Sequence, residues 1–456
     1  MKTFLDWSAF ENAGVGDAYA DIPKNGGNFA KAVAVCINSR HCESKDKGVM
    51  CPSFRISDDP LLSTGGRVWL LKAALNSNSL NEALNSDQLA EAMDLCVSCK
   101  GCKRECENEV DMAMIKIEYL AQRYIKNGVS LRIRLFANLP RLLHKYSWLK
   151  RLILWRNQSS LLTTLGQKFL GISANRKLPL PADKPFFETA KKNPICHEST
   201  KINDYQKSVV LFVDTFTQNF EPGNANAAID VLEAAGYQVV IAQADGVGKA
   251  PLCCGRTLLA HGLVDKAKAE AKRVLQVLHP FVEAGLPVIG LEPSCLLAIR
   301  DDYRFLGLGE LADKVAMNAV LFEEFIAKEH AAKRFKLDLK PLPSNSDITL
   351  VHGHCHQKAV GAMKSMRKVL KLIPDLEFEL IESSCCGMAG SFGLDAEHAE
   401  SSLAMAEQSL LPSIRSRPNA DIIANGFSCR HQIREYTGRG PTHIATLLHK
   451  ALTPRQ

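Results

Sequence analysis

Seven of the fifteen cysteines lie in the first 106 residues, and their spacing is the strongest chemical signal in the chain. Cys96, Cys99, Cys102 and Cys106 follow one another at intervals of three, three and four residues. This spacing is typical of [4Fe–4S] ligands, where three thiolates come from one short loop and a fourth from a distant one. Zinc sites usually use two separated C-x-x-C pairs, so a third closely spaced cysteine favours iron and sulfide. The spacing therefore predicts an iron–sulfur site, with zinc as the weaker alternative.

A second, less complete set of cysteines precedes this one. Cys36, Cys42 and Cys51 are more widely spaced, and Pro52 follows the last of them. A complete motif would have another cysteine near position 39, where Ser39 stands. We interpret this segment as a degenerate copy of the same motif, and we expect its three cysteines to be ligands as well.

The composition excludes several classes of protein. A chain of 456 residues with 46% hydrophobic and 23% charged residues is expected to form two to four globular domains. The first residues lack the basic and apolar regions of a secretory signal, and no run of about 18 apolar residues would cross a membrane. Clustered cysteines in such a chain indicate metal ligation in a reducing compartment rather than disulfides. We therefore expect a cytoplasmic protein.

One segment supplies the whole net charge of +7. Residues 119–182 contain no Asp or Glu but twelve Lys or Arg. Within it, residues 131–156 interleave basic, aromatic and leucine side chains at roughly helical spacing. Such helices lie in a membrane interface, or they connect domains and pack their apolar side on the protein; a nucleic-acid patch would need a recognition motif, which is missing. Peripheral contact with the inner face of the cell membrane and a simple connector both remain open, and we expect no nucleic-acid partner.

The second half of the chain contains an internal repeat. The first copy has predicted strands at 209–213, 238–242 and 287–291 and helices at 225–235 and 264–278. The second copy has predicted strands at 348–352, 377–382 and 421–424 and helices at 363–372 and 396–411. Alternating strands and helices predict two duplicated α/β units, each with a short parallel sheet.

Both copies place cysteines after a predicted strand and before a helix. The recurring cysteines are the Cys-Cys-Gly pairs Cys253-Cys254 and Cys385-Cys386 and the single Cys295 and Cys429, and the second copy adds Cys355. Ligands bind α/β folds at the carboxyl ends of strands, and a helix N-terminus favours the thiolate form. Because a disulfide between adjacent cysteines is strained, we predict that all seven are metal ligands.

These features divide the chain into five segments. We expect a loosely structured lead-in at 1–30, a helical ferredoxin-type domain at 31–125, basic helices and a Pro/Lys-rich linker at 126–205, and cysteine-rich units at 206–340 and 341–456. The predicted fold class is therefore α+β and multi-domain. Cys196, alone in the linker, is expected to be unliganded.

Together the motifs resemble the iron–sulfur module of FAD-linked 2-hydroxyacid dehydrogenases. Similar modules are those of glycolate oxidase and anaerobic glycerol-3-phosphate dehydrogenase, and the carboxy-terminal half of D-lactate and D-2-hydroxyglutarate dehydrogenases. The repeated units also resemble the cysteine-rich domains found in heterodisulfide reductase. The stretches that carry the resemblance are CINSRHCESKDKGVMCPSFR at 36–55, DLCVSCKGCKRECENEVDMA at 94–113, PLCCGRTL at 251–258, LEPSC at 291–295, HCHQKAV at 354–360, CCGMAGSFG at 385–393 and NGFSCR at 425–430.

The similarity to two-cluster ferredoxins implies how the first seven cysteines divide. In those proteins the fourth cysteine of each motif serves the other cluster. One complete [4Fe–4S] set would then be Cys96, Cys99, Cys102 and Cys51. The other would be Cys36, Cys42 and Cys106 with one open position, and we expect it to be filled. That site would hold a three-iron cluster, or a cube with Ser39 or His41 as the fourth ligand.

The cysteine-rich units depart from the heterodisulfide reductase pattern. The first copy begins with Asp214-Thr-Phe where the pattern has a cysteine, and neither copy has the C-x-x-C ending. We expect a further iron–sulfur centre in the second copy, and the first copy is the weaker candidate. His352, His354 and His356 surround Cys355, where one of them would ligate or orient, or all three would only form hydrogen bonds.

The resemblance implies an electron-transfer subunit. No flavin-binding motif or catalytic triad is visible in the sequence, so FAD and substrate oxidation are expected on a partner dehydrogenase chain, with a quinone or another carrier as acceptor. Two rival interpretations remain: a thiol/disulfide catalyst like heterodisulfide reductase, and a metal-stabilised or redox-sensing protein without enzymatic function.

Overall fold

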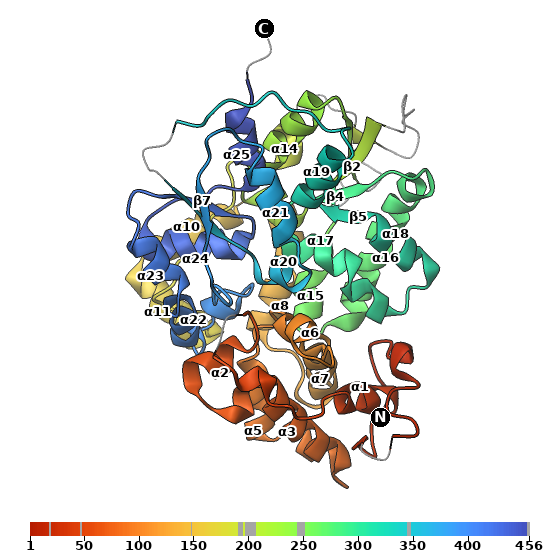
Figure 1. Cartoon of the computed structure of the whole chain (residues 1–456). Coiled ribbons are helices and arrows are strands. Elements are labelled where there is room, and N and C mark those ends of the chain that lie inside the picture. Colours follow the sequence, from red (N-terminus) through yellow and green to blue (C-terminus); the bar gives the residue numbers. More distant parts are fainter. Residues whose placement is uncertain are drawn as a thin grey trace.

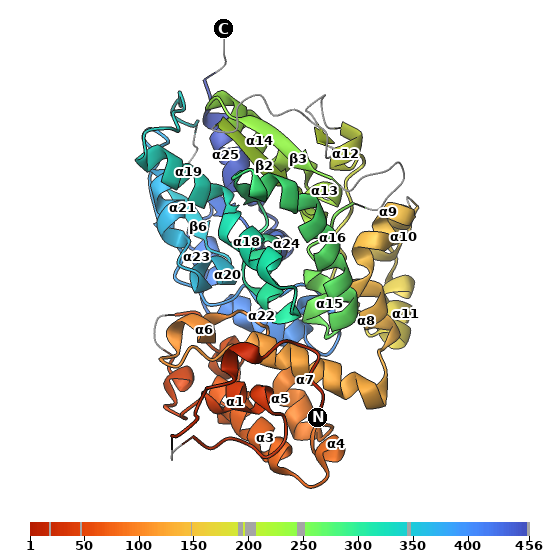
Figure 2. The same cartoon turned by 90° about the vertical axis from the view of Figure 1, so that its right-hand side faces the viewer.

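The computed structural model describes residues 1–17, 20–45, 48–146, 148–189, 195–196, 207–243, 251–343 and 348–453. Figure 1 shows a helical N-terminal part, drawn in red and orange, below two α/β units drawn mainly in green and blue. Figure 2 shows the yellow helices of residues 131–170 along the side of these units. The predicted α+β fold class is confirmed, because both sheets are short and parallel.

Short helices separated by cysteine loops make up the N-terminal part. They are α1 (Asn28–Ala34), α2 (Pro52–Ser57), α3 (Thr64–Asn76), α4 (Leu80–Ala83), α5 (Asp87–Asp94), α6 (Gly101–Glu105) and α7 (Met112–Asn127). α7 has a side-chain cap at its start. The Asp111 side chain accepts a hydrogen bond from Met114 N at 3.2 Å, which satisfies a free N–H of the first turn.

The first residues differ from the predicted loose lead-in. Leu5 and Trp7 are buried, and the Glu118 carboxylate on α7 accepts hydrogen bonds from the backbone N–H groups of Phe4 and Leu5 and from Trp7 Nε1. Glu118 is itself fully buried, so these donors replace the water that its charge would otherwise need. The lead-in is therefore fixed by one buried acid and two apolar side chains.

The basic segment is helical throughout most of its described length. Its helices are α8 (Leu131–Ala137), α9 (Leu139–Lys145), α10 (Leu149–Gln158) and α11 (Ser160–Leu170), and the short α12 (Phe186–Thr189) follows. Among the described residues, no helix combines the length and apolarity needed to span a membrane.

The first α/β unit is built on a parallel sheet with the order β1-β3-β2-β4-β5. Its strands are β1 (Ile195–Cys196), β2 (Ser208–Phe212), β3 (Gln238–Ala242), β4 (Val288–Gly290) and β5 (Ala319–Leu321). Its helices are α13 (Thr215–Asn219), α14 (Pro222–Ala234), α15 (Arg256–Ala260), α16 (Val264–Glu283), α17 (Pro293–Arg300), α18 (Glu310–Asn318) and α19 (Phe322–Ala331). All five residues of β2 are buried, as expected for a central strand covered on both faces.

The second unit has a three-stranded parallel sheet with the order β7-β6-β8. Its strands are β6 (Thr349–His352), β7 (Phe378–Leu380) and β8 (Asp421–Ala424). Its helices are α20 (Cys355–Ala359), α21 (Met363–Leu370), α22 (Ala399–Glu407), α23 (Leu410–Arg415), α24 (Phe427–Thr437) and α25 (Ile444–Ala451). The single helix predicted at 396–411 is thus two helices, with a break around Gln408 and Ser409.

Strand order supports the predicted duplication. The order β3-β2-β4 in the first unit is the order β7-β6-β8 in the second, and each central strand leads into a short helix, α13 or α20. The first unit adds β5 and β1 at its edges. Because β1 lies in the predicted linker and pairs with β3, part of that linker belongs to the sheet.

Shared cores hold the parts together. One apolar core combines Ile241 and Phe325 of the first unit with Val351 and Leu448 of the second. Another core joins the N-terminal helices to the first unit, for example through Tyr119 and Leu278.

A buried polar bridge also joins the two α/β units. His443, the N-cap of α25, lies with Nε2 3.2 Å from the Leu291 carbonyl oxygen of the first unit. Its Nδ1 accepts a hydrogen bond from Ala445 N at 3.1 Å. Both ring nitrogens are therefore used, and the neutral ring has one donor and one acceptor to match them.

We expect the His443 bridge to make the protein sensitive to acid. Burial, together with the charge of Arg430, lowers the pKa of His443 from 6.5 to about 3. The folded protein therefore holds this ring neutral, and its contribution to stability is complete above pH 6.5 and is lost as the pH falls towards 3. The loss reaches about 2 kcal/mol at pH 5.

The variant His443→Asn tests this expectation through its melting temperature, Tm. Asparagine keeps the N-cap acceptor but cannot titrate. At pH 7.5 its apparent Tm should lie below that of the wild type, and the difference should shrink by pH 5. The half-exposed His279→Asn serves as control, with no pH-dependent difference expected. A constant gap between wild type and His443→Asn would contradict the assignment.

Candidate metal centres

The loop of Cys51 is clamped at both ends. Cys51 has a positive φ of 51° and precedes Pro52, which starts α2. The Glu105 carboxylate accepts hydrogen bonds from Val49 N at 2.7 Å and Met50 N at 2.8 Å. Cys51 Sγ accepts one from Thr64 N at 3.1 Å. These bonds fix a thiol in a backbone conformation that non-glycine residues rarely adopt.

Cys96, Cys99 and Cys102 lie together around the start of α6. Burial raises the pKa of Cys99, and the neighbouring thiolates of Cys355, Cys102 and Cys96 raise it further. Burial also raises the pKa of Cys102 to about 12. Cys99 directly precedes Lys100, the N-cap of α6, and Cys102 is the second residue of that helix, so the C-x-x-C-x-x-C spacing places these thiols at one end of α6.

Cys36, Cys42 and Cys106 form the neighbouring group. Burial raises the pKa of Cys36, and the thiolates of Cys42 and Cys106 act in the same direction. A thiol hydrogen bond from Cys51 lowers the pKa of Cys42 to about 6. The pKa of Cys51 is in turn raised by its hydrogen bond with Cys42 and, more weakly, by Cys102 of the other group.

The two side chains proposed for the open position face solvent. Ser39 and His41 are both exposed. Asn38 is exposed as well, and its Oδ1 and Cys42 Sγ both lie 3.5 Å from the position that a Cβ on Gly65 would take.

The second α/β unit gathers four cysteines in a buried group. Cys355 begins α20, Cys385 and Cys386 follow β7, and Cys429 lies in the first turn of α24. Hydrogen bonds from the thiols of Cys385 and Cys429 lower the pKa of Cys386. Hydrogen bonding from the Cys385 thiol, aided by His354 and His356, also lowers the pKa of Cys355.

The glycine of the second Cys-Cys-Gly motif is required sterically. Gly387 has a φ of 82°, and a Cβ there would lie 2.0 Å from the Ser402 carbonyl oxygen. Only glycine permits this conformation and this close approach. The motif therefore marks a tight turn that aims both cysteines into one group.

The first unit has a smaller group made of Cys253, Cys254 and Cys295. All three are buried, and the Tyr303 hydroxyl donates a hydrogen bond to the Cys254 carbonyl at 2.9 Å. Thr215 begins α13 where Cys355 begins α20, so the fourth thiol is missing here. Asp214 caps α13 beside this group, and burial raises its pKa to about 6.

Two parts of the chain meet around Cys99. Cys99, Cys355 and Cys385 belong to one small buried cluster with Val49, Val97, Phe392 and Met405. Ser384 Oγ donates a hydrogen bond to the Val49 carbonyl at 2.7 Å, and His356 Nε2 lies 3.0 Å from the Ser98 carbonyl oxygen. The cysteine loops of the N-terminal part and the second unit are therefore in direct contact.

A buried ion pair binds the same loop to the first unit. Lys100 Nζ pairs with both Asp301 and Asp302, and Arg256 lies 3.1 Å from Asp302. Burial alone would lower the pKa of Lys100, but the carboxylates of Asp302, Asp111 and Asp301 outweigh it and raise the pKa. The sequence gives no sign of this pair, since its members are about 200 residues apart.

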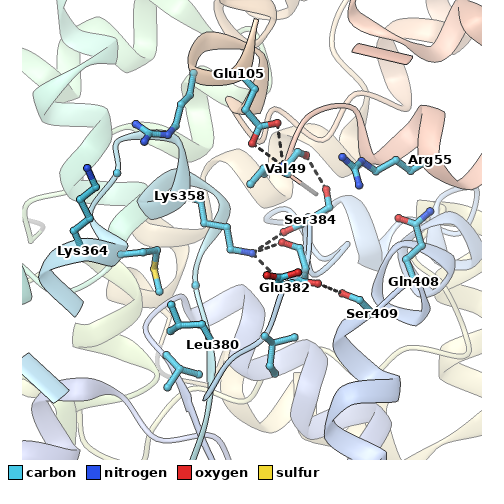
Figure 3. A pocket seen from close by; sticks show the side chains of 18 of the residues that line it. Val49, Arg55, Glu105, Lys358, Lys364, Leu380, Glu382, Ser384, Gln408 and Ser409 are labelled. Carbon is cyan, nitrogen blue, oxygen red and sulfur yellow. Dashed lines mark hydrogen bonds between the residues drawn. The ribbon is translucent and has the colours of Figure 1, made fainter. Parts of the chain in front are cut away.

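Two cavities border these groups. One, of about 580 Å³, extends from Ile133 and Phe136 on α8 to Cys355, Cys385 and Cys386. The other, of about 820 Å³, is the cleft in Figure 3. Its charged lining residues are mostly cationic; they are Lys45, Arg55, Arg104, Lys358, Lys364 and Arg367, with Glu105 and Glu382 as the acids.

The donor sets fit metal centres. Of the fourteen cysteines whose side chains are described, eleven are buried and all are free thiols. A buried thiolate without a cation is costly, whereas a metal ion holds a thiol deprotonated. Groups of three or four converging sulfurs match the ligand sets of iron–sulfur clusters. The side chain of Cys196, which we expected to be unliganded, lies outside the described residues.

Comparison with known proteins agrees with this geometry. Residues 35–111 match the family described as 4Fe-4S dicluster domain, and residues 349–434 match the family described as Cysteine-rich domain. The chain carries a 4Fe–4S dicluster domain and a cysteine-rich domain. The predicted resemblance to the iron–sulfur modules of FAD-linked dehydrogenases is thereby confirmed.

Three relatives from Escherichia coli (strain K12) illustrate how much of each protein the similarity covers. The chain is 23% identical to the glycolate oxidase iron-sulfur subunit, over 91% of its own length and 93% of the relative's. It is 28% identical to one subunit of anaerobic glycerol-3-phosphate dehydrogenase, over 54% of its length and 60% of the relative's. It is 24% identical to D-2-hydroxyglutarate dehydrogenase over 78% of its length, but this match spans only 34% of that longer protein.

We predict that removing the Lys100 charge will strongly destabilise the protein. Lys100→Met leaves Asp302, which is 1% exposed, with Arg256 as its remaining partner. Breaking a buried pair in this way costs about 3–5 kcal/mol. Urea unfolding of the anaerobic protein measures the loss.

Two further variants identify the cause. The surface pair Lys314–Glu283 is half exposed, so Lys314→Met should cost less than about 1 kcal/mol. Adding Asp302→Asn to Lys100→Met removes the carboxylate that Lys100 no longer neutralises and should recover part of the stability. Equal effects of the two lysine variants would contradict a structural role for the buried pair.

Proposed function

We propose that this chain is the electron-transfer subunit of an FAD-dependent 2-hydroxyacid dehydrogenase. The observation that supports this most directly is that Cys99, Cys355 and Cys385 share one buried cluster, with the hydrogen bonds of Ser384 and His356 joining the cysteine loops of the dicluster and cysteine-rich domains. Two redox domains that touch through their ligand loops are suited to passing electrons between them.

The cysteine groups would hold the redox cofactors. In the N-terminal domain the sets are Cys96, Cys99, Cys102 and Cys51, and Cys36, Cys42 and Cys106; in the second unit the set is Cys355, Cys385, Cys386 and Cys429. Iron–sulfur clusters, when bound, accept and release single electrons at potentials set by ligands, hydrogen bonds and burial. The set of Cys253, Cys254 and Cys295 is the weakest candidate, because it offers three thiols.

The relatives support a partner chain. Glycolate oxidase and anaerobic glycerol-3-phosphate dehydrogenase each have a subunit similar to this chain. We propose an FAD-binding dehydrogenase chain as the electron donor and a quinone or another carrier as the acceptor. The 580 Å³ cavity supports a small apolar acceptor, because Phe136, Phe216, Phe392 and Phe427 line it beside the Cys355 group.

We also propose that helices α8–α11 bind the cytoplasmic face of a membrane. Leu161, Leu165 and Phe169 form an exposed apolar stripe on α11 at intervals of four residues. Trp148, the N-cap of α10, and Trp155 within that helix are also exposed. The packed pair α10 and α11 lies at the outside of the molecule (Figure 2). An apolar stripe in a segment without acids fits an anionic lipid surface.

The Cys99→Ala variant tests electron transfer. It should remove one cluster and stop electron flow to the acceptor, while the flavin of the partner chain can still be reduced by substrate. Iron content and the reduced EPR spectrum of the complex measure the first effect, and acceptor reduction measures the second. Cys196→Ala is the matched control and should leave both unchanged. Acceptor reduction at the wild-type rate without that cluster would overturn the proposal.

Vesicle binding tests the membrane surface. Replacing Trp148 and Trp155 by Gln removes two large apolar side chains and should weaken binding to phosphatidylglycerol-containing vesicles by about tenfold or more. The equally exposed Trp69 on α3 provides the control variant Trp69→Gln. Equal binding of wild type and double variant, or no binding by the wild type, would rule out a membrane role for these residues.

A further inference from the structure

We propose that His352 is a ligand of the metal centre in the second cysteine-rich unit and coordinates through Nε2 beside Cys386 and Cys429. The inference rests on the proposed function in one respect, namely that this unit holds an iron–sulfur centre. It goes beyond that proposal by adding a nitrogen donor to a set that sequence reasoning assigned to four cysteines.

Geometry places the imidazole within the sulfur group. His352 is the last residue of β6, at the carboxyl end of the central strand. One of its ring nitrogens and the sulfurs of Cys386 and Cys429 all lie within 4.8 Å of one another. His352 is 1% exposed, so water does not reach its ring nitrogens from the surface.

Nε2 has no hydrogen-bond partner among the described residues, although it is fully buried. Leaving a buried polar nitrogen unsatisfied costs about 1–3 kcal/mol. Native structures rarely keep such an atom without a reason, and a bound ion is one of the accepted reasons. Coordination of a metal ion would satisfy this nitrogen.

The opposite ring nitrogen is anchored as a metal ligand requires. Ser383 Oγ lies 2.9 Å from His352 Nδ1, and Lys358 Nζ donates to Ser383 Oγ at 3.1 Å. Figure 3 shows Lys358 directed from the cleft towards the loop of Ser384, whose carbonyl it also reaches at 3.1 Å. With one lone pair engaged by Lys358, the Ser383 hydroxyl can use the other to accept from Nδ1–H, which leaves the Nε2 lone pair free. Metal-bound histidines usually donate their other N–H in this way.

The neighbouring histidines His354 and His356 use their ring nitrogens in hydrogen bonds. His354 Nδ1 accepts a hydrogen bond from His356 N. The His354 ring also packs against Gly426, where a Cβ would lie only 2.3 Å from His354 Cδ2. His356 Nε2 is engaged by the Ser98 carbonyl. His354 Nδ1 also lies 4.0 Å from Cys355 Sγ. Among these three described histidines, His352 is the one with a buried ring nitrogen that lacks a hydrogen-bond partner.

Comparison of the two units supports a role specific to the second. Asp214 caps α13 and His354 caps α20, so the equivalent of His352, two residues before the cap, is Phe212. The first unit thus lacks both the Cys355 thiol and the imidazole. A thiolate at this position would add negative charge to the centre, whereas a neutral imidazole does not, so the imidazole gives the higher reduction potential. His352 would accordingly make the second unit the higher-potential end of the chain.

Pulsed EPR on the full-length protein tests the ligand directly. The wild type is prepared anaerobically with ¹⁵N-labelled histidine and reduced. We expect a strongly coupled histidine nitrogen in the spectrum of the second-unit centre. His352→Gln should lose this coupling, and His352→Cys should lose it while keeping the iron and lowering the reduction potential. The control His356→Gln should retain it.

The opposing outcomes are distinct. A nitrogen coupling that persists in His352→Gln, or a wild-type spectrum with only the weak coupling of a hydrogen-bonded histidine, would overturn the assignment. So would an iron content that does not change when Cys386 and Cys429 are both replaced by Ser. None of these results affects the clusters of the N-terminal domain, whose failure would instead appear in the Cys99→Ala experiment.

Discussion

The burial of sulfur is the constraint on which the rest of the structure depends. Eleven of the fourteen described cysteines are buried, and none forms a disulfide among the described residues. A buried thiolate needs a nearby positive charge, and thiols packed against one another compete for one proton. Metal centres relieve both costs at once, so we expect binding of the clusters and folding of the cysteine loops to be coupled.

Ligand loops also form the contacts between domains. Cys99 shares a buried cluster with Cys355 and Cys385 from the second unit, while the adjacent Lys100 is paired with Asp302 of the first. Two consecutive residues therefore connect all three parts of the chain. This arrangement keeps the proposed redox sites close together, and it gives each site a rigid support from a neighbouring domain.

Much of this organisation could be predicted from local sequence signals. Cysteine spacing identified the ligand loops, and the recurrence of Cys-Cys-Gly after a strand identified the duplication. Long-range contacts left no such signal: nothing near Trp7 indicates that Glu118 anchors it, and nothing near Cys99 indicates Cys355. His352 was one of three equivalent histidines in the sequence, and only the fold distinguishes the ring that lies beside the sulfurs.

Iron, acid-labile sulfide and zinc content, measured together with EPR on the anaerobically purified protein, test the central claim most directly. The account predicts about eight or more irons per chain, matching sulfide, and S = 1/2 signals that appear on reduction. One or two zinc ions per chain without sulfide would contradict it, and would leave a metal-stabilised protein in place of an electron-transfer subunit.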